Sequence, residues 1–163
     1  MLANQSEICF WLGESFHSSG DGENARAWWL RAARQRCDFQ QMSVQDVSEM
    51  TYWTGLALER LGNKDQAEAL FARIYDHSVE LERTQPKIDY FATSLPAMLL
   101  FNEDLGRRHH IDALFLRAQA HIGLSRPAEA RSLLQETLNL DRNHAAAFDL
   151  FKRLGILHRG SVL

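Results

Sequence analysis

The sequence predicts an all-α fold of antiparallel helix pairs, and three observations lead to it. Prolines are scarce, since only Pro86, Pro96 and Pro127 occur in 163 residues, so long helices are allowed over most of the chain. Apolar residues recur at steps of three and four, the spacing of one helix face. A pattern of small and large residues also repeats three times along the chain.

The spacing of apolar residues places the helices in order. The first is indicated by Ile8, Trp11, Leu12 and Phe16, which share one helix face. The same spacing recurs further along, whereas no alternating β-branched run bounded by turn residues occurs. We therefore expect almost no strand, and helices over residues 5–18, 22–37, 45–61, 64–80, 87–105 (broken near Pro96), 109–123, 126–139 and 143–157.

Three segments share one set of offsets. In each, a small residue stands twelve positions before an alanine, a Gly or Ser stands five before it, and a large apolar residue follows it by four. Small side chains let antiparallel helices approach closely, and a glycine turns the backbone between them. The large residues are expected to fill the groove toward the next pair. The sets are Gly13, Gly20, Ala25 and Trp29; Gly55, Gly62, Ala67 and Phe71; and Ala118, Ser125, Ala130 and Leu134.

This spacing resembles the tetratricopeptide repeat, a helix–turn–helix unit of about 34 residues. On that register the units are residues 6–39, 48–81 and 111–144. The resemblance implies a right-handed superhelix in a single domain over residues 1–163, with a closing helix at 144–157 covering the last pair. Because the units start at uneven intervals, we expect residues 82–110 to insert one extra helix pair between the second and third units.

The insertion carries a second resemblance. The stretch Lys87-Ile-Asp-Tyr-Phe-Ala-Thr-Ser-Leu-Pro96, followed by residues 99–105, is similar to a segment in the C-terminal part of a bacterial family. Members of that family carry a large β-rich domain, suspected to be sugar-related, ahead of tetratricopeptide repeats. The resemblance implies that this chain is the repeat tail of a larger bacterial protein associated with carbohydrate metabolism. A natural start at Met1 would instead favour an independent adaptor.

Composition and charge exclude several classes of protein. Apolar residues make up 45% and charged residues 24% of the chain, close to the averages of globular proteins. The net charge of −3 argues against nucleic acid as a partner, because phosphate binders carry a clustered basic excess. No apolar run reaches the roughly 18 residues of a membrane span, and no secretory signal opens the chain. We therefore expect a cytoplasmic protein with no membrane partner.

The residue types that carry catalysis or bind metals form no motif. The seven histidines include no pair four apart with a carboxylate between them, and no nucleophile elbow, phosphate loop or dinucleotide fingerprint occurs. Cys9 and Cys37 are too few for a disulfide framework, and Cys9 falls on a face expected to be buried. The basic run Arg107 to His110 is interpreted as a solvated helix start. We expect no enzyme activity, no cofactor and no metal.

The resemblance to the repeat family predicts a binding groove, because the first helix of each pair lines the concave face of such a superhelix. The residues at the groove positions are aromatic with acidic edges. Family members that hold a terminal carboxylate use Lys, Arg and Asn there, and none of these types stands at those positions. The residues predicted to bind a partner are Phe10, Trp11, Glu14, Tyr52, Trp53, Phe115 and Gln119.

Two interpretations of these aromatic residues stay open. They pack internally against the insertion or a neighbouring domain, or they form a docking surface for an apolar or basic segment. Since an aromatic patch is rarely left open, a partner, a second copy of the chain or residues 86–105 should cover Trp11 and Trp53. The function expected is a non-enzymatic protein-interaction module. The alternative is a structural or dimerisation tail that orders an enzyme domain on the same chain.

Overall fold

The computed structural model describes residues 4–35, 38–40, 43–84 and 105–160, and for residues 38–40, 43–45 and 156–160 it describes the backbone alone. This part of the chain folds into seven helices and one two-stranded hairpin. The elements are α1 Ser6–Ser18, α2 Gly22–Ala33, β1 Asp38–Gln40, β2 Ser43–Gln45, α3 Glu49–Arg60, α4 Lys64–Arg83, α5 Leu105–Gly123, α6 Pro127–Leu140 and α7 Ala145–Gly160.

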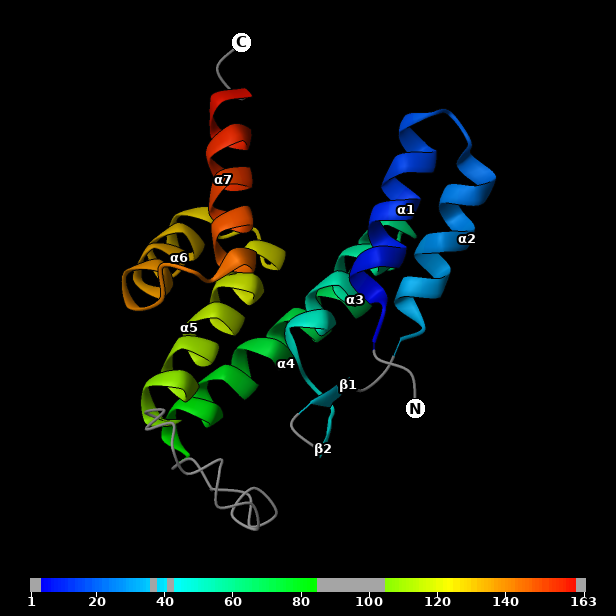
Figure 1. The fold of residues 1–163 in the computed structure, drawn as a ribbon. Helices are drawn as coiled ribbons and strands as arrows, with labels where there is room; N and C mark the ends of the chain where they lie inside the picture. The colour runs from blue at the N-terminus through cyan, green and yellow to red at the C-terminus, as the bar shows by residue number, and fades with distance from the viewer. Residues whose placement is uncertain (1–3, 36–37, 41–42, 85–104, 161–163) are drawn as a thin grey trace.

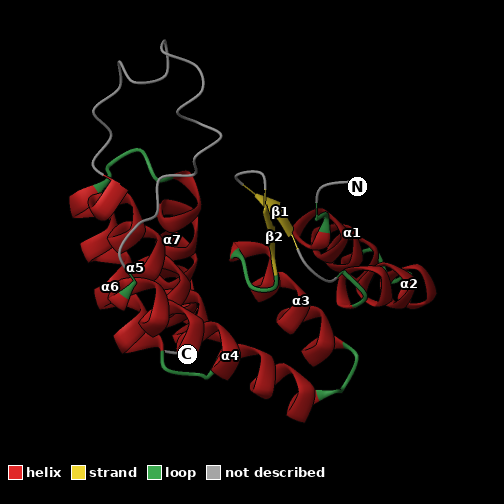
Figure 2. Ribbon diagram, turned by 90° about the horizontal axis from the view of Figure 1, so that it is seen from below, coloured by secondary structure: helices red, strands yellow, loops and turns green. Residues whose placement is uncertain are grey.

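The helices form three antiparallel pairs, α1–α2, α3–α4 and α5–α6, and α7 closes the stack against α6 (Figure 1). Figure 2 shows the pairs following one another in chain order. One core runs through all of them, from Cys9 in α1 to Leu150 in α7. The predicted all-α architecture of stacked helix pairs with a closing helix is confirmed.

The prediction of helix through residues 22–37 and again from residue 45 is wrong at the connector between the first two pairs. There β1 and β2 pair antiparallel, with Phe39 opposite Val44 in the register. Each strand has three residues with a single apolar member, which is too short for a period-two pattern to be seen. α3 begins only at Glu49, because Ser48 caps it: the Ser48 hydroxyl accepts from the Met50 N–H, and Thr51 Oγ1 accepts from the Ser48 N–H.

The turns inside the pairs follow the repeated Gly or Ser. Gly20 has φ 84° and Gly62 has φ 83°, a left-handed conformation that suits glycine, and Ser125 takes the equivalent place at φ 58°. The helices after these turns start on favourable residues. Asp21 accepts from the Asn24 N–H at 3.0 Å, and Pro127 occupies the first turn of α6.

Small residues at the helix crossings leave room for large aromatic rings. The rings were expected to pack toward the next pair, but some of these contacts lie within one pair. A Cβ added to Gly13 would lie 2.4 Å from the Trp29 indole of the same pair. The Phe71 ring packs against two glycines, Gly55 of its own pair and Gly123 of the next pair. A Cβ added to Gly55 would lie 2.4 Å from the ring, and one added to Gly123 would lie 2.3 Å from it. Phe71 therefore joins the second pair to the third.

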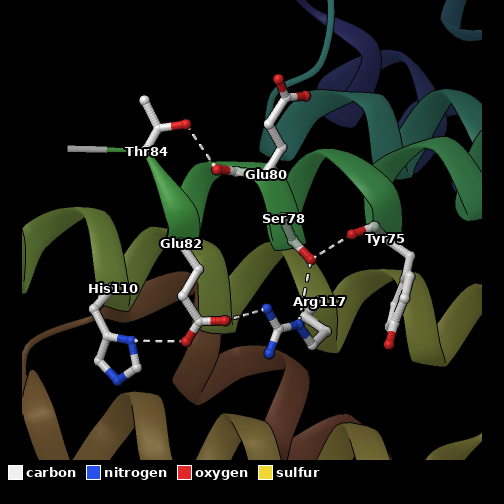
Figure 3. Close-up of polar contacts among 7 residues, drawn as sticks. All are labelled: Tyr75, Ser78, Glu80, Glu82, Thr84, His110 and Arg117. Carbon is white, nitrogen blue, oxygen red and sulfur yellow. Dashed lines mark hydrogen bonds and ion pairs between the residues drawn. The ribbon is translucent and has the colours of Figure 1, made fainter. Parts of the chain in front are cut away.

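The predicted insertion over residues 82–110 falls mostly on residues 85–104, which the structure does not describe. Its flanks, Glu82 and His110, belong to α4 and α5, which pack side by side (Figure 3). Units two and three are therefore in direct contact through α4 and α5.

A polar network holds this junction together. Figure 3 shows the Glu82 carboxylate of α4 between Arg117 and His110 of α5. The Arg117 Nη2 donates to Glu82 Oε2 at 2.6 Å, and His110 Nδ1 lies 3.3 Å from Glu82 Oε1. The Arg117 Nε also donates to the Ser78 hydroxyl at 3.4 Å. The hydrogen bond from Arg117 holds the pKa of Glu82 below its ordinary value of 4.5, and the two positive neighbours add to this.

This lowered pKa predicts a pH-dependent contribution to stability. The folded state releases the Glu82 proton more readily than the unfolded chain, so the contribution is complete above the unfolded pKa. It is lost as pH falls from about 4.5 through the folded pKa. We expect Glu82→Gln to lower the free energy of unfolding at pH 7 and to match the wild type in strong acid, measured by urea unfolding. Glu80→Gln, two residues away, serves as the control; a pH-independent gap for Glu82→Gln would contradict the assignment.

Candidate functional site

The first helices of the three pairs and the closing helix enclose a cavity of about 430 Å³. We call it the aromatic cavity. No second helix of a pair contributes to it, so it lies on the face that the repeat register predicted to be concave. Its lining residues are Glu7, Trp11, Glu49, Met50, Trp53, Phe115, Gln119, Ala146, Asp149, Leu150, Lys152 and Arg153.

A ladder of rings leads from this cavity into the core. The Trp11 and Trp53 ring centres are 5.5 Å apart, Trp53 and Tyr52 are 5.1 Å apart, and Tyr52 and Phe71 are 6.1 Å apart. Trp11 keeps 41% of its surface exposed, whereas Trp53 keeps 6%. Tilted and edge-on ring pairs at these distances are favourable. The ladder therefore fixes the position of Trp11, which presents an open indole at the cavity.

The structure brings together four of the seven predicted binding residues at this cavity: Trp11, Trp53, Phe115 and Gln119. Phe10 and Tyr52 are only 3% and 2% exposed and pack behind Trp53. These two residues belong to the core of the stacked helix pairs. Their spacing could not separate the two roles, because the same helix face carries both groove and core positions.

Glu14 forms an ion pair with a residue of α3 and does not line the aromatic cavity. Both of its carboxylate oxygens accept hydrogen bonds from Arg60 of α3, at 2.7 Å each. This forked geometry is the strongest form of ion pair at a partly exposed site. Glu14 thus joins the first pair to the second, and its place in the predicted groove is taken by residues of α7.

Sequence reasoning missed the five cavity residues on α7. The signal that locates them is the repeat itself. One further unit of about 34 residues, counted from residue 111, would begin at residue 145, where α7 starts. The second, fifth, sixth and ninth positions of a unit are groove positions. In the extra unit they fall on Ala146, Asp149, Leu150 and Arg153, all of which line the cavity. The closing helix thus takes the place of a fourth first helix.

A second, larger cavity of about 810 Å³ continues the groove. It shares Glu49 and Phe115 with the aromatic cavity. We call it the acidic cavity, because its lining includes five carboxylates and only two arginines: Asp46, Glu49, Asp76, Glu80 and Asp112, with Arg73 and Arg108. Among the described residues, the two linings together contain seven carboxylates against four Lys or Arg side chains.

The basic run at the start of α5 does not simply face solvent, as was expected. Arg108 and His109 line the acidic cavity beside Asp112, and His109 Nδ1 is buried without a hydrogen-bond partner. Burial raises the pKa of Asp112, while the positive charges of Arg108, His109 and His144 oppose that shift. The expectation of a solvated helix start is therefore wrong for His109.

The described residues offer little for catalysis or metal binding. Within the described ranges, no three His, Cys, Asp or Glu side chains are grouped to hold a metal ion. Cys9 is a buried free thiol, and burial raises its pKa, which disfavours the reactive thiolate. None of the described helices combines the length and apolar character that crossing a membrane requires.

Glu7 lines the aromatic cavity, and burial there disfavours its ionised form. Burial raises the pKa of Glu7; the Trp11 indole opposes the shift, Asp149 adds to it, and Arg153 opposes it. A raised folded pKa favours folding below the unfolded value of about 4.5, and this contribution is lost as pH rises through the folded pKa. The ionised Glu7 therefore destabilises the fold at neutral pH.

We expect Glu7→Gln to raise the melting temperature at pH 7, because glutamine keeps the shape of the side chain and removes the charge. The gain should shrink as pH falls toward the unfolded pKa. Thermal unfolding followed by circular dichroism at neutral and acid pH checks this. A lower melting temperature of the variant at pH 7 would show that the Glu7 charge stabilises the fold.

Comparison with known proteins adds one match to a family model. Residues 38–78 match the model described as tetratricopeptide repeat. This segment runs from β1 through α3 into α4 and overlaps the predicted second unit. The second helix pair is thus similar in sequence to a tetratricopeptide repeat, and the described residues fold as an all-α stack of helix pairs.

Among solved structures, one described as "MamA RS-1 ArsTM double mutant" is similar over 99% of both chains, with 17% sequence identity and a TM-score of 0.26.

Proposed function

We propose that this protein is a non-enzymatic interaction module whose groove, formed by the aromatic and acidic cavities, binds a basic segment of a partner protein. The observation that carries the proposal is the exposure of Trp11 at the aromatic cavity. Trp11 is 41% exposed, yet a ladder of buried rings holds it at the mouth of a cavity that four helices build. Repeat proteins of this class use their concave faces for binding, and tryptophan is the residue type most enriched among binding anchors.

The charge of the groove selects the kind of partner. In the part of the chain that the structure describes, seven carboxylates line the groove against four Lys or Arg side chains, so a segment rich in Lys or Arg meets a complementary potential. Glu7 supports this view, because its charge is costly to the fold. Groups that a fold carries at a cost are typical of functional sites. The acidic lining gives Glu7 and Asp149 a role that internal packing does not explain.

The wider context belongs to the same proposal. The resemblance of residues 87–105 supports placing the chain as the repeat tail of a larger bacterial, cytoplasmic protein associated with carbohydrate metabolism. In that setting the groove would receive either a separate protein or a neighbouring domain of the same protein. The second candidate, a structural or dimerisation tail, is favoured by exposed apolar side chains at Ile8 and Phe148, which are 62% and 48% exposed.

Selection of peptides from a random library against the immobilised 163-residue chain tests the proposal. We expect enriched peptides to carry net positive charge. Trp11→Ala should weaken their binding at least about tenfold, the effect of losing one anchor, measured by fluorescence anisotropy. Ile8→Ala is the matched control, because Ile8 is exposed on the same helix and does not line the cavity; it should leave the affinity unchanged.

Two results would count against the interaction module. One is binding of the selected peptides that Trp11→Ala does not weaken. The other is a failure to enrich any peptide, together with a dimer in light scattering that Trp11→Ala converts to a monomer. The latter result would establish the dimerisation tail instead.

A further inference from the structure

The aromatic cavity already contains a cation, the guanidinium of Arg153 on α7. Its Cζ lies 4.5 Å from the ring centre of Trp11 and 5.6 Å from that of Trp53. A guanidinium is attracted to the face of a tryptophan ring, more strongly where water is excluded. The two indoles, supplied by α1 and α3, therefore form a bracket that accepts a guanidinium group.

Arg153 satisfies this bracket incompletely. Its Nη1 is buried and has no hydrogen-bond partner, although the Glu7 and Asp149 carboxylates line the same cavity. The ion pairs found among the described residues do not include Arg153. A buried donor without an acceptor is costly. In the structure, Arg153 contacts the two rings while its Nη1 is left without an acceptor.

The cavity also contains an acceptor without a donor. Gln119 is 1% exposed, and its Nε2 donates to the Glu49 carbonyl at 3.2 Å. That bond fixes the orientation of the amide, and Gln119 Oε1 is left buried with no partner. Buried polar atoms are normally paired. An N–H group entering the cavity beside Gln119 would supply the missing donor.

We propose that the Trp11–Trp53 bracket is a recognition subsite for an arginine side chain of the partner, and that Arg153 occupies it in the unbound protein as an internal competitor. The inference rests on the proposed function and names the residue that the groove selects. An entering guanidinium takes the place of Arg153 against the two rings, donates to Gln119 Oε1 and lies near Glu7 and Asp149. Arg153 moves out toward solvent, which the open side of Trp11 permits.

Such competition has a measurable consequence, because an occupant that fills a site most of the time lowers its apparent affinity in proportion to the unfilled fraction. The probe is the blocked tripeptide acetyl-Gly-Arg-Gly-amide, titrated into the full chain and followed by tryptophan fluorescence. We expect Arg153→Gln to bind it about tenfold more tightly than the wild type, as for a bracket filled about nine-tenths of the time. The Gln analogue of the peptide should bind neither protein.

Lys152→Gln is the matched control. It removes one positive charge from the lining of the same cavity, but the Lys152 ammonium lies over Phe148 and outside the bracket. We expect its effect to stay within about twofold, the size of a screened surface charge. A second measurement needs no variant: nitrogen-15 side-chain NMR of the wild type should show the Arg153 guanidinium signal shifting toward that of a solvated arginine as the peptide is added.

Each contrary result has a definite meaning. If Arg153→Gln and Lys152→Gln increased the affinity for the peptide equally, the increase would come from the lost positive charge alone. That result would refute the competition. Unchanged or weaker binding by Arg153→Gln, or an Arg153 signal that does not respond to bound peptide, would refute it as well. No binding of the tripeptide by Arg153→Gln up to about 10 mM, where single side-chain contacts are still detected, would overturn the subsite. In each case the interaction module would stand if the selected peptides remain sensitive to Trp11→Ala.

Discussion

Replacing Phe71 by alanine should lower the free energy of unfolding by about 3–5 kcal/mol, the usual cost of removing a fully buried ring. The side chain is 0% exposed, and its ring lies against two glycines, Gly55 of its own pair and Gly123 of the next. The Tyr52 ring packs 6.1 Å away. Backbone surrounds much of the ring, so the space left by alanine cannot close by side-chain movement alone. Urea unfolding monitored by circular dichroism measures the loss.

Phe148→Ala is the control for this change, because Phe148 is 48% exposed and its removal should cost less than about 1 kcal/mol. Gly55→Ala and Gly123→Ala test the same packing from the other side. Each would place a Cβ within 2.4 Å of the Phe71 ring, and overpacking of this kind costs roughly 1–3 kcal/mol. A loss below about 1 kcal/mol for Phe71→Ala would mean that units two and three do not depend on this ring.

Trp53→Ala and Trp11→Ala should separate stability from binding. Trp53 is 6% exposed and contacts the rings of Phe10, Trp11 and Tyr52, so its loss should cost about 3–5 kcal/mol. Trp11 is 41% exposed, and its removal should cost about 1 kcal/mol or less while abolishing most of the peptide affinity. Thermal unfolding and anisotropy titrations of the two single variants measure both effects.

A different outcome would reassign the two residues. Equal stability losses for both variants would make Trp11 part of the core. If Trp53→Ala left the stability unchanged, the ring ladder would have no role in holding Trp11 in place.

The helix pairs could be predicted from the sequence because their signals are local. The offset between Gly55 and Ala67 lies within one pair, and the left-handed turns at Gly20 and Gly62 depend on a single residue each. The hairpin could not be predicted in this way. Its strands have three residues each, and such a length carries no periodicity.

The candidate site was only partly predictable, because the neighbouring units decide whether a residue at a groove position is exposed or buried. Tyr52 and Trp53 are adjacent in sequence, and both fell at predicted groove positions, yet Tyr52 packs behind Trp53 and only Trp53 lines the cavity. Arg153 lies 142 residues after Trp11, and only the stacking of all the pairs brings the two together. Extending the repeat register one unit further would have found Arg153, but not its contact with both tryptophan rings.

Chemical-shift mapping of a nitrogen-15 labelled chain with a library-selected peptide tests the central claim most directly, that the face made by the first helices and α7 is the binding surface. The account predicts that the largest shifts arise at Trp11, Trp53, Gln119 and Asp149, which line the aromatic cavity. Residues exposed on the second helices, such as Arg26, Glu68 and Glu136, should hardly move. Shifts concentrated on α2 and α6, with the residues that line the two cavities unaffected, would contradict it.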